Sequence, residues 1–131
     1  MAALLGQRGE PVTVFDSRPD PRIATGLGGR SINLAIAERG LAALRQLDGV
    51  VAKIEKLVVP MNGRIIHDDN VSGLQPYGNL ANEVLWSVDR TALINVLLDA
   101  AEATGNVDIG FGQRCRAIDF DLDLISLTDS T

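Results

Sequence analysis

The stretch Gly26-Leu-Gly-Gly-Arg-Ser-Ile-Asn-Leu-Ala-Ile-Ala-Glu-Arg-Gly-Leu-Ala-Ala-Leu44 decides the expected fold. Two adjacent glycines, Arg30 and Ser31 lead directly into an apolar stripe at helical spacing, formed by Leu34, Ala37, Leu41 and Leu44. The pattern predicts a helix that begins near Ser31 and ends about Leu47, with Ser31 or Asn33 as its cap. A glycine turn, a cation and a helix N-terminus together suit an anion or an electron-rich ring, so we expect a cofactor there.

The composition limits the class of protein. Its 131 residues suffice for one domain, and 46% hydrophobic with 22% charged residues are ordinary for a soluble globular protein. The net charge of −5 argues against a nucleic-acid surface. Cys115 is the single cysteine, so no disulfide can form within the chain, and a cytoplasmic location is expected. No apolar run reaches the roughly 18 residues of a membrane helix, so we expect no membrane contact.

The rest of the chain alternates between strand and helix patterns. Two further helices are expected over 1–8 and, capped by Asp89, over 90–104. Strands are expected over 11–15, 63–67, 83–88 and 107–111, and a hairpin over 114–127 about Asp121. Residues 72–80 are expected to form a loop because of their proline and glycines, and 51–61 fits either a helix end or a strand. The order of elements predicts an α/β fold.

The N-terminal pattern indicates a segment of a longer protein. A helix end, a strand that ends in Asp16 and a further helix form the second half of a nucleotide-binding βαβ unit. The first strand and its Gly-x-Gly-x-x-Gly turn would precede Met1, so we expect a fragment or a gene model begun at an internal methionine. The sheet edge left by that strand would favour self-association.

Four polar residues are candidates for binding. Asp16, at a strand end, either accepts hydrogen bonds from a ribose or faces solvent. Arg90, in the first turn of a helix, either faces a bound anion or swings into solvent. Arg64 and Tyr77 can together hold a carboxylate, although unrelated surface residues are the commoner case for such a spacing.

Three other conspicuous residues have structural interpretations. His67 is the single histidine, so neither a histidine-based triad nor a multi-histidine metal site can form. Cys115 lies in a strand pattern without a neighbouring base, which favours a buried residue over a nucleophile. Trp86 lies in an apolar strand and is expected in the core.

Four motifs carry a resemblance to a known family. They are Phe15-Asp-Ser-Arg-Pro-Asp-Pro-Arg22, Gly29-Arg-Ser-Ile-Asn-Leu-Ala35, Leu74-Gln-Pro-Tyr-Gly78 and Trp86-Ser-Val-Asp-Arg90. In order and spacing the chain resembles, over nearly its whole length, the kynurenine 3-monooxygenase family of FAD-dependent aromatic hydroxylases. The resemblance implies a partial Rossmann-like FAD-binding domain of the para-hydroxybenzoate-hydroxylase type, with an antiparallel crossover beginning near Arg114. The later Gly-Asp flavin motif, the substrate-covering sheet and the C-terminal helices would follow residue 131.

The resemblance also implies roles for individual residues. Asp16 would bind the adenosine ribose of FAD, and Arg18 would lie beside the adenosine. Ala35 would border the flavin side, Arg90 would face the cofactor, and Cys115 would touch it through its backbone.

On the substrate side, Arg64 and Tyr77 match the pair that grips the carboxylate of L-kynurenine. The implied reaction uses NADPH to reduce FAD and O₂ to hydroxylate the ring, giving 3-hydroxykynurenine in tryptophan catabolism. No side chain of the chain would act as a nucleophile. Another FAD-dependent aromatic hydroxylase, and a non-catalytic remnant that serves as a binding module, remain alternatives.

Two residues depart from the family pattern. Gly28 stands where the family usually has arginine, and Asn62 replaces another basic or polar residue, so both lower the local positive charge. With the Gly-rich turn also absent, the segment alone is expected neither to bind FAD tightly nor to turn over.

Overall fold

The computed structural model describes residues 1–23, 32–68, 71–79 and 83–129. The chain divides into two compact units. Unit 1 comprises Met1–Gly29 and Leu97–Thr131, and unit 2 comprises Arg30–Val96. Within the described ranges, none of the helices combines the length and apolar character needed to span a membrane.

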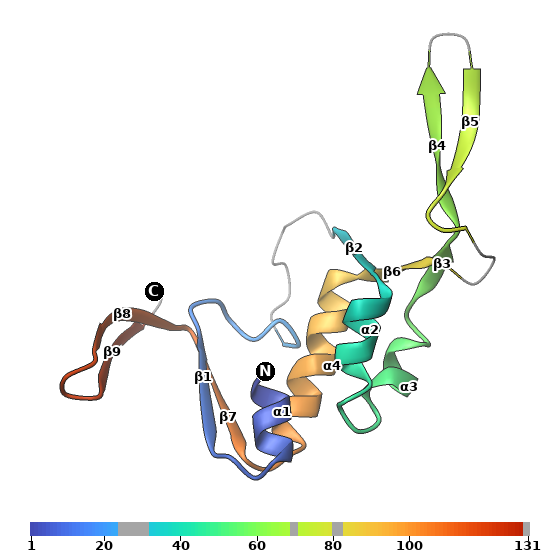
Figure 1. Ribbon diagram of the computed structural model, residues 1–131. Helices are drawn as coiled ribbons and strands as arrows, with labels where there is room; N and C mark the ends of the chain where they lie inside the picture. The colour runs from blue at the N-terminus through green and yellow to red at the C-terminus, as the bar shows by residue number, and fades with distance from the viewer. Residues whose placement is uncertain (24–31, 69–70, 80–82, 130–131) are drawn as a thin grey trace. The chain divides into compact units, whose positions relative to one another are not determined.

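Unit 1 is built on a pair of parallel strands (Figure 1). Its elements are α1 (Ala2–Gln7), β1 (Val12–Asp16), the last turns of α4 (Arg90–Glu102), β7 (Val107–Phe111), β8 (Gln113–Asp119) and β9 (Leu124–Asp129). Strand β1 pairs with β7 from Val12 opposite Val107 to Asp16 opposite Phe111. Both strands therefore end at the same edge, where ligands of parallel sheets commonly bind.

Helix α1 ends in a glycine turn and packs closely on its neighbours. Gly9 has φ +86°, and the N–H groups of Gly9 and Glu10 bond the carbonyls of Gly6 and Leu5, as in a Schellman motif. A Cβ at Gly6 would lie 2.4 Å from Thr104 Oγ1 and 2.6 Å from Val107 Cγ2. The absence of a side chain at Gly6 thus lets α1 approach the start of β7.

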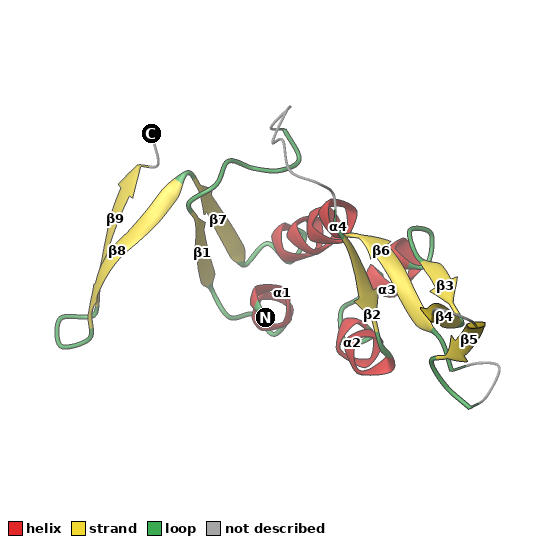
Figure 2. Ribbon diagram, turned by 90° about the horizontal axis from the view of Figure 1, so that it is seen from above, coloured by secondary structure: helices red, strands yellow, loops and turns green. Residues whose placement is uncertain are grey.

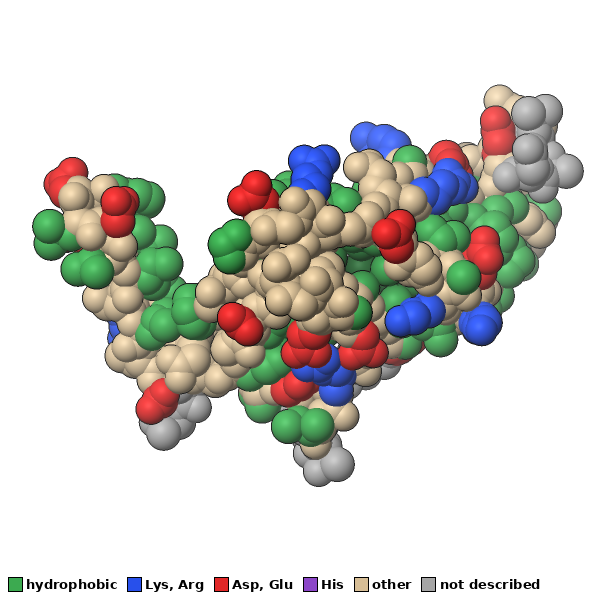
Figure 3. Space-filling model, turned by 90° about the horizontal axis from the view of Figure 1, so that it is seen from below, with side chains coloured by type: hydrophobic (Ala, Val, Ile, Leu, Met, Phe, Trp, Pro, Cys, Tyr) green, Lys and Arg blue, Asp and Glu red, His purple; other side chains and the backbone are tan. Residues whose placement is uncertain are grey.

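The β8–β9 hairpin exposes apolar side chains. Its turn is closed by Asp119 Oδ1, which accepts the N–H groups of Asp121 and Leu122 at 3.0 Å each. Figure 3 shows hydrophobic side chains over this hairpin, at the left of the view. The exposed large residues in it are Ile118, Phe120, Leu122, Leu124 and Ile125.

Unit 2 is built on a three-stranded antiparallel sheet. Its elements are β2 (Asn33–Ile36), α2 (Glu38–Leu44), α3 (Val50–Ile54), β3 (Val59–Met61), β4 (Gly63–Asp68), β5 (Val71–Pro76), β6 (Leu85–Asp89) and the first turns of α4. Strand β6 lies between β2 and β3 (Figure 2). The core of the unit comprises Ile36, Leu47, Val50, Ile54 and Val88, of which the last three are each only 1% exposed.

The expected helix start near Ser31 is wrong. Asn33–Ile36 forms strand β2, which pairs antiparallel with β6, and the helix begins only at Glu38. Leu34 fits the expected helical stripe and also, together with Ile36, a strand alternation, and pairing with β6 decides between the two. Ser31 lies outside the described residues, and Asn33 is a strand residue rather than a cap.

The expected loop over 72–80 is also wrong in its first half. Val71–Pro76 forms β5, paired with β4 so that Gly63 lies opposite Pro76 and Arg64 opposite Gln75. The Tyr77 N–H donates to the Asn62 carbonyl at 3.0 Å, so Asn62 and Tyr77 form a hydrogen-bonded pair. Hydrogen-bonded and non-hydrogen-bonded pairs alternate in an antiparallel ladder, so the next pair, Gly63 and Pro76, is a non-hydrogen-bonded one. Pro76 therefore removes no hydrogen bond from this ladder.

The remaining expected elements are confirmed. Asp89 caps α4 through a 2.8 Å bond from the Ala92 N–H to Oδ1. The expected helix at the N-terminus, the strands around 11–15, 63–67, 83–88 and 107–111, and the hairpin near Asp121 are all present. The ambiguous stretch 51–61 contains both alternatives, since α3 ends at Ile54 and β3 begins at Val59.

We predict that Gly6→Ala destabilises the chain by about 1–3 kcal/mol, because the new methyl group would overlap Thr104 and Val107. Urea unfolding followed by circular dichroism measures the change. Gly73→Ala is the matched control, since nothing lies within 4 Å of its added Cβ. A Gly6 variant as stable as the Gly73 variant would contradict the close packing of α1.

Candidate functional site

The carboxyl edge of β1 holds an ion pair between two of the expected cofactor-binding residues. Arg18 Nε lies 3.1 Å from Asp16 Oδ1, and Arg18 Nη2 lies 2.9 Å from Asp16 Oδ2. The Arg18 backbone N–H also donates to Oδ1, at 2.9 Å. Asp16 and Arg18 therefore lie together, as an adenosine-binding pair would require.

The ion pair limits how many hydrogen bonds the Asp16 carboxylate can accept from a ribose. Hydrogen bonds from the Arg18 side chain, more than any other contact, lower the pKa of Asp16 below its ordinary value of 3.8. From the described residues, Oδ1 accepts two hydrogen bonds and Oδ2 only one, which leaves one acceptor position on Oδ2 open among them. The carboxylate can thus accept one ribose hydroxyl with the ion pair intact, and two if the exposed Arg18 side chain moves away.

A second cluster fixes the loop that follows Asp16. The Arg22 guanidinium contacts the carboxylates of Asp20, Asp99 and Glu102, at 2.7 Å from Nη2 to Asp20 and 3.0 Å from Nη1 to Asp99. These bonds raise the pKa of Arg22, and they lower the pKa values of Asp20 and Glu102 below their ordinary ranges. Arg22 Cζ also lies 5.9 Å from the centre of the Phe111 ring.

The β4–β5 hairpin brings the two expected substrate-binding residues to one face. Arg64 lies opposite Gln75, and Tyr77 continues the ladder opposite Asn62. Cross-strand partners share a face, as do residues two apart along a strand, so Arg64, Gln75 and Tyr77 lie on the same face. Gln75 Oε1 accepts a 2.7 Å bond from Arg64 Nε. This bond fixes one edge of the guanidinium, and among the described residues the Nη groups have no acceptor and are free to donate.

The other expected cofactor residues lie on different elements. Ala35 lies in β2 opposite Ser87, and Arg90 is the first residue of α4. Cys115 lies in β8 beside an irregularity of the ladder and is exposed, so the expectation that it is buried is wrong. The expected niche at Arg30 and Ser31, with Gly28, lies outside the described residues.

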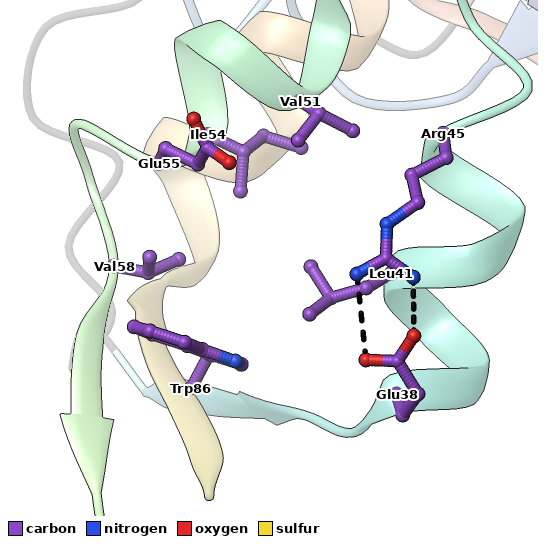
Figure 4. A pocket seen from close by; sticks show the side chains of 8 residues that line it. All are labelled: Glu38, Leu41, Arg45, Val51, Ile54, Glu55, Val58 and Trp86. Atoms are coloured by element: carbon purple, nitrogen blue, oxygen red, sulfur yellow. Dashed lines mark hydrogen bonds and ion pairs between the residues drawn. The ribbon is translucent and has the colours of Figure 1, made fainter. Parts of the chain in front are cut away.

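One cavity of about 430 Å³ lies in unit 2 (Figure 4). Its apolar lining includes Leu41, Val58 and Trp86, and an ion pair between Glu38 and Arg45 forms part of its wall. Trp86 is therefore a half-buried wall residue and not a core residue as expected. Neither Arg64 nor Tyr77 is among the residues that line this cavity.

Two supports of the site are not predicted by the sequence. One is Gln75, which holds Arg64 and lies in the stretch expected to be a loop, and the other is the set of contacts that anchors Arg22. The spacing of Asp99 and Glu102, three residues apart on a helix, indicates one acidic face that a nearby arginine can bind.

His67 has a structural contact, with Nδ1 2.7 Å from Ser72 Oγ. Among the described residues, no three His, Cys, Asp or Glu side chains are arranged so that they could hold a metal ion.

The sequence is similar to curated proteins named kynurenine 3-monooxygenase. It is 48% identical over 127 residues to that of Xanthomonas campestris pv. campestris strain B100, and 43% identical over 122 residues to that of Stenotrophomonas maltophilia strain K279a. Each match covers 92% of this chain, and the chain spans about a quarter (26%) of each relative's length. No family model matches the chain.

The fold is similar to that of PqsL from Pseudomonas aeruginosa, a probable FAD-dependent monooxygenase. The two superpose with a TM-score of 0.71 at 14% identity, over 99% of this chain and 35% of PqsL. A PqsL variant gives a TM-score of 0.73 at 15% identity. The expected fold class is thereby confirmed: an α/β fold with antiparallel strands, similar to that of part of PqsL.

We predict that acid weakens unit 1 through the Arg22 cluster. The pKa values of Asp20 and Glu102 are lower in the folded chain than their ordinary values of 3.8 and 4.5, so the stability they contribute is complete above about pH 5. It is lost as the pH falls through the lowered values. In Arg22→Gln the carboxylates lose this partner, so the variant should melt at a lower temperature than the unchanged chain at pH 6. This difference in melting temperature should become smaller as the pH falls from 6 to 3. A difference that is constant over this range would contradict the cluster's role.

Proposed function

We propose that this segment, whose sequence resembles kynurenine 3-monooxygenases, is part of a flavin monooxygenase that hydroxylates L-kynurenine to 3-hydroxykynurenine with NADPH and O₂. The observation that carries the proposal is the identity of 43–48% to proteins of that name over 92% of the chain. The hairpin supplies a second, structural argument, because its register places a cation, Arg64, and a phenol, Tyr77, on one face.

The residues at the carboxyl edge of β1 suit the adenosine end of FAD. Asp16 ends a parallel strand, its side chain is one-third exposed, and one of its oxygens retains an open acceptor position. Arg18, beside it, can lie along the adenosine. Ala35, Arg90 and Cys115 are proposed to contact the rest of the cofactor, Cys115 through its backbone. When bound, FAD supplies the redox chemistry that activates O₂.

The β4–β5 hairpin suits the amino-acid end of the substrate. Nε of Arg64 is occupied by Gln75, so the Nη groups remain to donate to a carboxylate. Tyr77, 42% exposed on the same face, can donate a further hydrogen bond through its hydroxyl. The two residues would hold and orient the substrate, and no side chain of this segment is required to act as a nucleophile or a metal ligand.

A chimera tests the proposed activity. This chain replaces the matching segment of the Xanthomonas campestris relative, and the parent enzyme is the control. We predict that the folded chimera binds FAD and that L-kynurenine stimulates NADPH consumption with formation of 3-hydroxykynurenine. Stimulation by a different aromatic acid alone would indicate another FAD-dependent hydroxylase. A folded chimera that binds no FAD would indicate a non-catalytic binding module, and the isolated segment is expected to bind FAD weakly in any case.

The substrate grip is tested by two substitutions in the chimera. We predict that Arg64→Met raises KM for L-kynurenine about tenfold to a hundredfold, because a charge-assisted hydrogen bond contributes about 1.5–3 kcal/mol. Tyr77→Phe should raise KM about twofold to tenfold, since it removes one neutral donor. Arg8→Met, a change of another exposed arginine, is the control. Unchanged KM values in both variants would remove Arg64 and Tyr77 from the binding site.

A further inference from the structure

The loop between β1 and Ile23 is tied to unit 1 at two points. Near its start, the Arg18 carbonyl accepts the N–H of Gly112 at 3.0 Å, and Gly112 has φ +69° in the turn after β7. Near its end, Arg22 binds Asp99 and Glu102 on the last turns of α4. The segment that carries Asp16 and Arg18 is therefore held from both sides by elements far away in the sequence.

Every N–H group of the Arg22 guanidinium has a carboxylate acceptor. Nε lies 3.0 Å from Asp20 Oδ1, and Nη2 reaches Asp20 at 2.7 Å and Glu102 at 3.0 Å. Nη1 reaches Asp99 at 3.0 Å and the second oxygen of Glu102. A lysine ammonium could not reproduce this planar set of bonds from five N–H donors. The side chain is only 22% exposed, so the arrangement is partly shielded from water.

The charges exclude a direct role of Arg22 in binding an anion. One guanidinium faces three carboxylates, so the cluster is negative overall, and all five of its donors are occupied. A pyrophosphate would have to displace a carboxylate and would meet the other two. The cluster therefore fits an anchor rather than a phosphate-binding site.

The anchor lies directly next to the proposed adenosine site. Arg22 Cζ is 5.9 Å from the ring of Phe111, and Phe111 is the cross-strand partner of Asp16. Asp20, which Arg22 binds through both oxygens, lies in the same loop as Arg18. Release of Arg22 would thus free the loop beside the carboxylate that accepts the ribose, and would leave three carboxylates in mutual repulsion.

We propose that Arg22 is a positioning residue for the adenosine half of the cofactor: it fixes the Ser17–Arg22 loop on α4 and so holds Asp16 and Arg18 in place for the ribose. The inference rests on the proposed function, because it assumes that FAD binds at this edge. It implies that Arg22 affects ligands that contain adenosine and leaves contacts to the flavin ring unchanged.

The test compares FAD with FMN, which lacks the adenosine half. In the apo form of the chimera, Arg22→Lys and Arg22→Gln should raise Kd for FAD at least tenfold, as measured by quenching of flavin fluorescence. Kd for FMN should change less than twofold, and kcat at saturating FAD should stay within twofold of the unchanged chimera. Arg45→Gln, which breaks the Glu38 ion pair in unit 2, is the control and should leave both Kd values unchanged.

Glu102→Gln tests the same role in case the arginine variants misfold. It keeps Arg22 and a neutral acceptor at position 102, and should raise Kd for FAD by a smaller factor than the arginine variants do. Equal changes in Kd for FAD and FMN, or none, would overturn the positioning role. If the unchanged chimera binds FMN but gains nothing from the adenosine half of FAD, the inference fails while flavin binding stands. If it binds neither flavin, the proposed function fails as well.

Discussion

The parallel pairing of β1 with β7 is the constraint on which the proposed nucleotide site depends. It joins two segments that lie on either side of unit 2 in the sequence, and its register places Asp16 opposite Phe111. Closing such a long loop costs conformational entropy, which the burial of Ala3, Ala101 and Val107 helps to offset. The turn after β7 then brings the Gly112 N–H to the Arg18 carbonyl.

Local signals in the sequence predicted much of the fold. The Asp89 cap, the Gly9 stop and the apolar runs of β1 and β7 each act within a few residues, so the sequence predicts them correctly. The helix expected from Ser31 does not form because Leu34, which fits the helical stripe, also alternates with Ile36 as in a strand, and pairing with the distant strand β6 decides the outcome. The strand at 71–76 was missed because Gly73 and Pro76 normally indicate turns, whereas both lie in positions of β5 that tolerate them.

The sequence motifs identify the residues that are expected to contact a ligand. Asp16 and Arg18 form an ion pair, and Arg64 and Tyr77 share a face, as their proposed roles need. The residues that hold these side chains in place cannot be predicted from the local sequence. Gln75 becomes a partner of Arg64 only through the hairpin register, and Arg22 meets α4 only through tertiary folding. The residues that hold a site in place are thus harder to predict than those that touch a ligand.

Arg64 and Tyr77 are proposed to hold the carboxylate of an aromatic amino acid. The most direct measurement is a titration of the FAD-loaded chimera with L-kynurenine and with its decarboxylated analogue, followed by the change in flavin absorbance. We expect the analogue to bind at least tenfold more weakly than L-kynurenine, and Arg64→Met to reduce this difference to less than threefold. Equal affinity for the two ligands, or a difference that survives in Arg64→Met, would contradict this proposal.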